Sequence, residues 1–312
     1  MSFWENKNVL VTGSTGFVGR HLSKKLTSLG ANVFGVARNT VGSNSLKTDI
    51  LDFKKINDFI KKKKIKICFH LAGEALVEAG QSDPHNTFKT NVDGTLNILE
   101  ISRLNNLEKI IVGSTARVYG DNKVPFLESY TSKPSRPYES SKACADLIAQ
   151  SYADTFSLPV LIPRFVNIYG PGDLNFNRLI PKTIRSVLEK EAPHMWGGSA
   201  RRDYIYIDDA VDAYIKLGEL PEKLMDSNRI YNFGTGEVIS VRQLIEKIIK
   251  LSGNKFPIEK VEKERPDEIS LQYVSTQKAS KLLSWKPKNT LTSGLENTLY
   301  WYKNYFRTVG IK

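Results

Sequence analysis

The sequence predicts an α/β fold in which a doubly wound parallel sheet is followed by a smaller C-terminal α/β domain. Short apolar runs alternate with amphipathic stretches through the first half of the chain, as strands and helices do in parallel sheets. A glycine-rich string at 13–19 directly follows the first apolar run. The alternation stops after Asn167, where glycines and a proline predict a loop.

Hydrophobic periodicity assigns the individual elements. It predicts strands at 9–12, 32–37, 67–72, 109–113 and 159–165, and helices at 18–29, 53–63, 86–104 and 138–156. Beyond the loop at 167–172, we expect helices at 179–190 and 240–251, a strand at 202–207 and a turn at 234–236. We assign residues 1–168 and 203–235 to the larger domain, and residues 169–202 and 236–312 to the smaller one.

Composition narrows the class of protein. The chain has 312 residues, 40% of them hydrophobic, and no apolar run as long as a membrane span. Residues 1–7 lead into a strand without a signal peptide, so we expect a cytoplasmic protein with no membrane partner. Cys68 and Cys144 are too few for a disulfide framework or a metal site, and their apolar surroundings predict buried thiols. The net charge is +12, but we find no aromatic-rich basic motif that indicates a nucleic-acid partner, and the lysine run at 61–66 is typical of a solvated helix end.

The glycine string predicts a dinucleotide-binding turn between a strand and a helix. Gly13 permits the tight turn, Gly16 lets the backbone approach a pyrophosphate, and Gly19 lets the helix pack on the strand. The helix N-terminus supplies N–H donors and about half a positive charge. Other residues of the string that would contact the cofactor are Thr15, Phe17 and Val18. The alternative is a tight turn that binds nothing.

The end of the second strand selects between NAD and NADP. An acidic residue there would bond the ribose hydroxyls and repel a 2′-phosphate. This chain has Ala37-Arg38 instead, and a guanidinium suits a phosphate, so NADP is favoured unless Arg38 is only a surface residue. Asp49 and Ile50 follow a short third strand and would flank the adenine.

Tyr138 and Lys142 are candidates for proton transfer because they lie one helical turn apart in the predicted helix after Pro137. A phenol has a pKa of about 10, so it needs nearby positive charge to act near neutral pH. Thr115 would hold a substrate hydroxyl by a hydrogen bond. Tyr119 and Lys123 have the same spacing, but the glycine, aspartate and asparagine between them predict a turn. Together with the glycine string, these residues indicate nicotinamide-dependent chemistry at a carbon–oxygen bond.

These motifs make the whole chain resemble the extended short-chain dehydrogenases that modify nucleotide sugars. The matching strings lie at 12–19, 69–73, 91–95, 113–120, 138–142, 164–172, 202–209 and 284–287. Phe3-Trp4 and the stretches at 178–181 and 268–279 look most like the branch that holds CDP-glucose 4,6-dehydratase and its relatives. The resemblance implies a Rossmann-type dinucleotide-binding domain, a nucleotide-sugar-binding domain and a homodimer.

The resemblance also assigns roles by position. It implies a catalytic triad of Thr115, Tyr138 and Lys142, and a cofactor lining that adds Leu71, Ala72, Gly73 and Asn91. A nucleotide-diphosphate sugar would be bound by Asn167, Arg178, Trp196, Arg202 and Arg265, with the arginines mostly at the diphosphate. The alternatives are that Arg202 only pairs with Asp203 or Asp208, and that Trp196 is ordinary core.

One departure from the family pattern bears on the reaction. The 4,6-dehydratases carry an acid, or an Asp-Lys pair, directly after the Thr or Ser of the triad, whereas this chain has Ala116-Arg117. Alanine cannot move a proton and arginine stays protonated, so dehydration is disfavoured. The leading hypothesis is an NAD(P)-dependent epimerase acting at C4 through a 4-keto sugar. The alternatives are an NADPH-dependent reductase of 4-keto-6-deoxy sugars, a dehydratase with a displaced acid, and a non-catalytic dinucleotide sensor.

Overall fold

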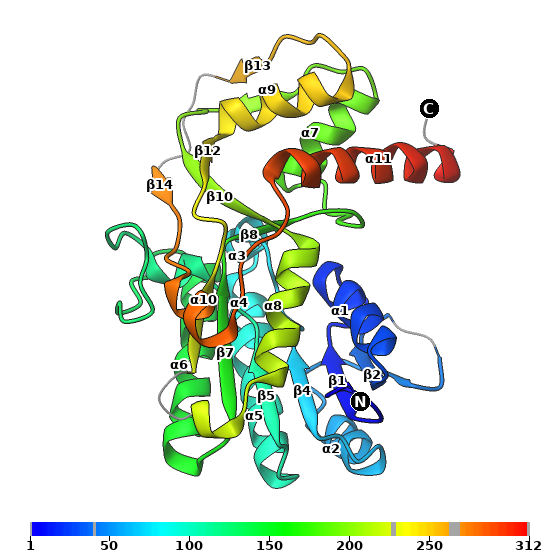
Figure 1. Ribbon diagram of the computed structural model, residues 1–312, viewed down its shortest axis with the longest axis vertical. Coiled ribbons are helices and arrows are strands. Elements are labelled where there is room, and N and C mark those ends of the chain that lie inside the picture. The colour runs from blue at the N-terminus through cyan, green and yellow to red at the C-terminus, as the bar shows by residue number, and fades with distance from the viewer. Residues whose placement is uncertain (1, 40–41, 226–228, 262–268, 311–312) are drawn as a thin grey trace.

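A parallel sheet of eight strands forms the centre of the larger part of the molecule (Figure 1). The structure is a computed structural model, and it describes residues 2–39, 42–225, 229–261 and 269–310. The strand order is β11-β7-β5-β4-β1-β2-β3, with β6 beside β7. These strands are β1 (Asn8–Thr12), β2 (Asn32–Ala37), β3 (Ser45–Lys47), β4 (Ile67–His70), β5 (Lys109–Val112), β6 (Ser114–Thr115), β7 (Val160–Phe165) and β11 (Ile230–Phe233).

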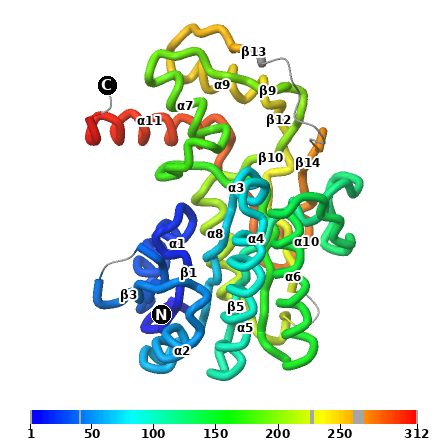
Figure 2. Tube along the Cα trace, turned by 180° about the vertical axis from the view of Figure 1, so that it is seen from behind, coloured from blue at the N-terminus to red at the C-terminus, as the bar shows by residue number. Residues whose placement is uncertain are grey.

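Helices cover both faces of this sheet, as the alternating pattern predicts. One face packs on α1 (Phe17–Ser28) and α8 (Ile207–Glu219), where Leu22, Leu26 and Ala210 are buried. The other face packs on α2 (Phe53–Lys62), α5 (Gly94–Leu104) and α6 (Pro137–Phe156), which lie toward the viewer in Figure 2. Each face therefore has its own apolar core, and the predicted doubly wound fold is confirmed.

The smaller part lies above the carboxyl ends of the main strands in Figure 1. Its principal sheet has the order β12-β10-β14, with β8 also beside β10. Its elements are β8 (Asn167–Tyr169), α7 (Leu179–Leu188), β9 (His194–Trp196), β10 (Arg201–Tyr206), β12 (Val238–Ser240), α9 (Val241–Ser252), β13 (Glu259–Val261), β14 (Leu271–Gln272) and α11 (Leu291–Val309). The short connecting helices are α3 (Val77–Ser82), α4 (Pro84–Phe88), η2 (Ala116–Tyr119), η3 (Glu222–Leu224) and α10 (Gln277–Leu283).

Two predicted elements differ from the structure. The helix expected at 86–104 is divided into α4, a π-helical turn η1 (Lys89–Asp93), and α5. The loop expected at 167–172 begins with β8, because Asn167–Tyr169 pairs with Tyr204–Tyr206 of β10. Both differences arise from tertiary contacts, which periodicity along one segment does not report. The domain boundaries at 168, 202 and 235 stay a prediction.

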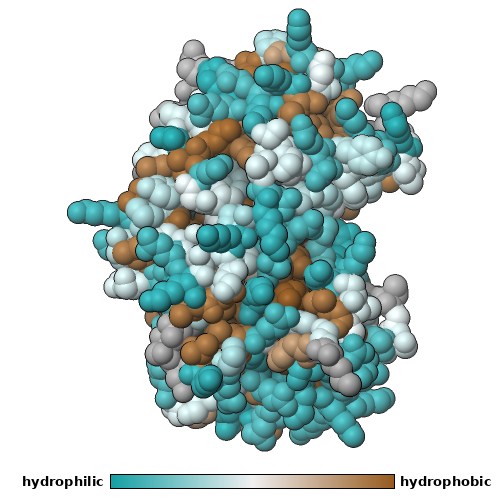
Figure 3. Space-filling model, in the orientation of Figure 1, coloured by the Kyte–Doolittle hydropathy of each residue, from teal (hydrophilic) through white to brown (hydrophobic). Residues whose placement is uncertain are grey.

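The surface corrects one expectation about the thiols. Cys68 is buried in β4, but Cys144 is exposed on α6, because the apolar residues around it face inward while its own position faces out. The lysine run ends α2 with exposed side chains, and the lower end of the molecule in Figure 3 is mostly hydrophilic. Within the described ranges, no helix is both long and apolar enough to cross a bilayer.

Candidate active site

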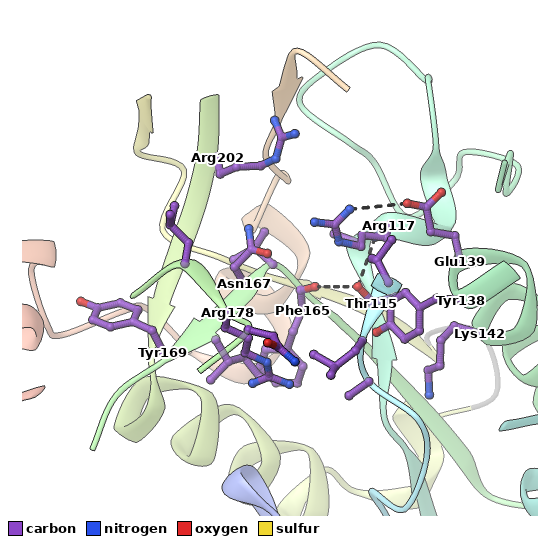
Figure 4. Close-up of a pocket in the computed structure, with 18 of the residues that line it drawn as sticks. Thr115, Arg117, Tyr138, Glu139, Lys142, Phe165, Asn167, Tyr169, Arg178 and Arg202 are labelled. Atoms are coloured by element: carbon purple, nitrogen blue, oxygen red, sulfur yellow. Dashed lines mark hydrogen bonds and ion pairs between the residues drawn. The ribbon is translucent and has the colours of Figure 1, made fainter. Parts of the chain in front are cut away.

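A cavity of about 420 Å³ opens where the carboxyl ends of the main strands meet the smaller part. Ligands of open parallel sheets bind at this edge. Eleven of the residues singled out from the sequence line it: Val18, Leu71, Ala72, Gly73, Thr115, Tyr138, Lys142, Asn167, Arg178, Trp196 and Arg202. The fold therefore gathers residues from eight separate segments, and Figure 4 shows many of these side chains around the cavity.

Thr115 and Tyr138 meet in the wall of the cavity. Thr115 ends β6 and Tyr138 lies in the first turn of α6, whose first residue is Pro137. Thr115 Oγ1 donates to the Phe165 carbonyl at 3.5 Å and accepts from the Arg117 N–H at 3.2 Å. Burial raises the pKa of Tyr138, while the charges of Arg117 and then Arg178 and the Thr115 side chain lower it.

Lys142 lies one turn after Tyr138 on α6, as the spacing predicts. Its Nζ donates to the carbonyl of Gly113 at 2.5 Å. Burial lowers the pKa of Lys142 to about 8, and the carboxylate of Asp146, one further turn along, opposes that shift. The positive charges that act on Tyr138 here come from Arg117 and Arg178 rather than from Lys142.

Asn91 connects the cofactor edge to the catalytic helix. It lies in the π-helical turn and is 1% exposed. Its amide accepts from the Glu74 N–H at 2.8 Å and donates to Ser141 Oγ at 2.9 Å, and Ser141 in turn donates to the Tyr138 carbonyl. Asn91 therefore fixes the 73–75 loop against α6. This positioning role is in addition to the contact with the cofactor that the sequence predicts for Asn91.

A second set of hydrogen bonds joins β1 to the same turn through His70. Thr12 Oγ1 accepts from two backbone N–H groups, of Leu71 and Ala72, so its proton goes to His70 Nδ1 at 2.8 Å. His70 Nε2 then donates to Thr95 Oγ1 at 3.1 Å, since the Thr95 proton goes to the Asn91 carbonyl. Burial lowers the pKa of His70 to about 3, so the ring is neutral and structural.

The glycine turn has the shape that a dinucleotide requires. Gly13 has φ +67°, and a Cβ on Gly19 would lie 2.2 Å from the Gly13 carbonyl oxygen. Gly16 begins α1 with no side-chain cap and no acidic residue in the first turn, so the helix N–H groups are available to an anion. Ser14 Oγ is buried there without a hydrogen-bond partner among the described residues. These residues fit the pyrophosphate of NAD.

The remaining cofactor candidates surround this turn. Thr15 and Phe17 line an adjoining open cavity with residues 172–178, and Arg20 holds that segment by donating to the Gly172 carbonyl at 2.7 Å. Arg38 is exposed directly after β2, and Asp49 is exposed after β3. Ile50 is buried against Gly94, so it has a packing role as well.

The predicted substrate residues reach the cavity from the smaller part. Arg202 is buried on β10 and donates to the Arg201 carbonyl at 2.9 Å. Arg178 caps α7 and pairs with Asp173 at 3.1 Å. Asn167 donates to the Asp203 carbonyl at 3.1 Å. Trp196 is 44% exposed on β9 and is therefore not ordinary core. Arg265 lies outside the described residues.

Tyr119 and Lys123 do not form a second catalytic pair. The segment at 120–123 is a turn, as predicted, and the Tyr119 hydroxyl donates to Asn232 Oδ1 at 2.8 Å in the core. Burial raises the pKa of Tyr119 to about 12. The Tyr119 hydroxyl therefore has a structural role.

Sequence reasoning missed residues that support the site. Asp146 binds Arg164 through two bonds of 2.9 Å and accepts from Ser114 Oγ, which fixes the strand that ends at Thr115. Its i+4 spacing from Lys142 was an available signal. Gly80 of α3 gave no such signal, yet a Cβ there would lie 2.9 Å from the Tyr138 nitrogen.

Comparison with known proteins agrees with this geometry. A UDP-glucuronate 4-epimerase of Thermodesulfobacterium geofontis is 29% identical over 94% of this chain and 95% of its own. A CDP-glucose 4,6-dehydratase of Salmonella typhimurium is 29% identical over 98% and 93%. The structure of a UDP-glucose 4-epimerase from Thermotoga maritima is 28% identical and superimposes with a TM-score of 0.90 over 96% of this chain and 99% of that one. Residues 9–234 match the NAD dependent epimerase/dehydratase family. The chain therefore belongs to the NAD dependent epimerase/dehydratase family and is an NAD-dependent enzyme.

Proposed function

We propose that the enzyme epimerises a nucleotide-diphosphate sugar at C4. The observation that supports this most strongly is that Thr115 and Tyr138 lie together in the cavity wall while neither of the two residues after Thr115 is an acid. The two residues after Thr115 are the buried Ala116 and the positively charged Arg117. An epimerase needs one group that removes and returns a proton, whereas a dehydratase needs a further acid to expel water.

In this proposal Thr115 and Tyr138 hold the C4 hydroxyl of the sugar. Tyr138 accepts the hydroxyl proton as the sugar is oxidised and returns it after the 4-keto sugar has turned over. Bound NAD supplies a hydride acceptor and donor at the same carbon. Lys142 holds the cofactor ribose, while the charges of Arg117 and Arg178 favour the phenolate.

The nucleotide end stays fixed while the sugar turns. We assign the diphosphate to Arg178, Arg202 and Arg265, because guanidinium groups make paired hydrogen bonds to phosphate oxygens. We assign the base to the exposed face of Trp196, with Asn167 nearer the sugar. Only the hexose then needs space to rotate, and it lies at the end of the cavity lined by Thr115 and Tyr138.

Identification of the nucleotide released on denaturation tests the proposal. We expect tightly held NAD⁺, because an internal redox cycle returns the cofactor to its starting form. Incubation with UDP-, dTDP-, CDP- and GDP-hexoses should give a C4 epimer by NMR and no 4-keto-6-deoxy product by mass spectrometry. Loss of water at a metabolically useful rate would contradict the proposal, and Glu74, Glu78 and Asp173 would then be the first acids to replace.

A reductase of 4-keto-6-deoxy sugars is the second candidate, and Arg38 is the observation that favours it. Its exposed guanidinium follows β2 at the place where an acid would select NAD. A reductase would bind NADPH more tightly than NADH, and Arg38→Ala would remove that preference. Calorimetric titration with both cofactors distinguishes the two candidates.

We also propose a cytoplasmic homodimer joined through α5 and α6. The outer surfaces of these helices expose Leu96, Leu104, Leu147 and Phe156, and Cys68 and Cys144 form no disulfide. Light scattering should give twice the chain mass, and Leu147→Glu should shift it toward one chain.

A further inference from the structure

One arginine in the cavity, Arg117, has not yet been assigned a contact with the substrate. Arg117 follows Thr115 by two residues, and its side chain is 25% exposed. Among the charges that lower the pKa of Tyr138, that of Arg117 acts most strongly, so the guanidinium lies close to the phenol. Figure 4 shows it between the Thr115 and Tyr138 side of the cavity and Asn167. A fixed positive charge therefore stands beside the position proposed for the C4 hydroxyl.

Glu139 orients this guanidinium. The Glu139 carboxylate is 1% exposed, and its Oε1 lies 3.5 Å from Arg117 Nη1. Its Oε2 accepts from the backbone N–H and the hydroxyl of Ser135 at 3.5 and 3.4 Å. Ser135 therefore fixes one oxygen of the Glu139 carboxylate, and the other oxygen orients the Arg117 guanidinium along the cavity wall.

This contact does not use up the hydrogen-bonding capacity of Arg117. The structural pair of Arg164 and Asp146 provides a comparison, because both side chains are at most 3% exposed and two bonds of 2.9 Å join them. Arg117 makes one long contact of 3.5 Å, and its guanidinium forms no other hydrogen bond within the described part of the chain. Arg117 lines the cavity, and most of its five N–H donors make no hydrogen bond within the described residues.

We propose that Arg117 binds a carboxylate on a carbon next to C4, so that the substrate is a nucleotide-linked acid sugar. This inference rests on the proposed function, since it takes Thr115 and Tyr138 as the residues that hold the C4 hydroxyl. A neutral substituent would leave a partly desolvated guanidinium with unfilled donors, whereas a carboxylate accepts two parallel bonds from it. The carboxylate has two chemical sources: the C6 acid of a hexuronate, or an acidic ether at O3.

Matched pairs of ligands test the proposal and distinguish the sources. Affinities are measured by calorimetry in the Tyr138→Phe background, so that no turnover occurs. UDP-glucuronate is compared with UDP-glucose, and UDP-N-acetylmuramate with UDP-N-acetylglucosamine. We expect the acid of one pair to bind about tenfold or more tightly than its neutral partner, as a charge-assisted bond provides.

The variants assign that preference to Arg117. Arg117→Gln should bring the ratio of affinities close to one, and Arg117→Lys should keep part of it, because the charge remains while the paired donors are lost. Arg185→Gln removes an arginine that pairs with Glu189 on α7 outside the cavity, and it should leave the ratio unchanged. If the uridine compounds do not bind, glucuronate 1-phosphate and glucose 1-phosphate give the base-free comparison.

Equal affinity for acid and neutral sugars, or a ratio that Arg117→Gln leaves unchanged, would overturn the inference. These measurements report binding alone, so they stand apart from the proposed function. A product other than a C4 epimer would refute epimerisation while the preference for a carboxylate remained. If the enzyme epimerises at C4 but binds both sugars of each pair equally, the proposed function stands and the carboxylate site at Arg117 is refuted.

Discussion

Burial and neighbouring charges shift the pKa of Tyr138 in opposite directions, and the residues responsible can be named. Burial raises the pKa of the phenol, and Arg117, Arg178 and Thr115 lower it. These three side chains come from η2, from the residue that precedes α7, and from β6. The ionisation of Tyr138 therefore depends partly on the smaller part, which supplies Arg178, and a change in any one of these residues should move the pH dependence of turnover.

Replacement of Tyr138 by phenylalanine should nearly abolish turnover, because it removes the group that carries the proton. NAD binding should stay close to that of the wild type, since one oxygen is lost and little surface changes. Steady-state rates and calorimetry measure the two effects. Tyr119→Phe is the control: it should lower stability by about 1 kcal/mol through the lost bond to Asn232 and keep the turnover number. Activity of Tyr138→Phe within a few-fold of the wild type would refute its role.

Lys142 should lower the stability of the cofactor-free enzyme at neutral pH. Burial lowers its pKa to about 8 from 10.5, so between these values the unfolded chain binds more protons than the folded one. The contribution of Lys142 to the free energy of unfolding therefore rises as the pH increases from about 8 to 10.5. We expect urea unfolding at pH 7 and pH 10 to show the wild type gaining about 1–2 kcal/mol relative to Lys142→Met. A pH-independent difference between the two proteins would contradict this.

At the scale of elements, the first turn of α6 depends on the helix packed against it. Gly80 in α3 brings that helix so close that a Cβ would lie 2.9 Å from the Tyr138 nitrogen and 3.0 Å from its Cβ. In a free helix, alanine is favoured over glycine by about 1 kcal/mol. Here Gly80→Ala should instead lower both stability and the turnover number, because it displaces Tyr138. Gln81→Ala, at the exposed neighbouring position, should be nearly silent in unfolding and rate measurements.

The elements also show how far the sequence alone leads. The glycine turn and the Tyr138–Lys142 spacing are local signals, and the structure has the turn and the helix at the predicted places. The π-helical turn at Lys89–Asp93 is different, because Asn91 within it bonds to Glu74 and Ser141, and neither residue is close to it in sequence. Helix α8 was overlooked although Asp208 and Asp209 in its first turn are a typical start signal.

The pairing of Arg117 with Glu139 could not be predicted either. The two residues are 22 positions apart, and their contact depends on η2 lying against the start of α6. Charge alone gives many possible partners for an arginine, and only the fold selects one. The residue types of the site were therefore predictable from short motifs, whereas the contacts that orient them were not.

At the scale of the whole molecule, Asp209 in α8 binds the segment at 288–289 that leads into α11. Its buried carboxylate accepts from the N–H groups of Lys288 and Asn289 and from the Asn289 amide, at 2.9 to 3.1 Å. Asp209→Asn should cost about 2–3 kcal/mol of stability, because it leaves buried donors unpaired. We also expect weaker nucleotide-sugar binding with NAD affinity retained. Asp208→Asn, at an exposed position, is the control for calorimetry and unfolding.

Lys288 and Asn289, which bind Asp209, lie close to the end of the chain. On the ribosome, the main sheet is therefore synthesised before these contacts can form. The main sheet has its last strand once Phe233 has left the exit tunnel. Strand β14, which carries Gln272 into the cavity wall, and the segment that Asp209 grips both emerge later. The glycine turn at 13–19 is therefore synthesised well before the residues that complete the cavity wall.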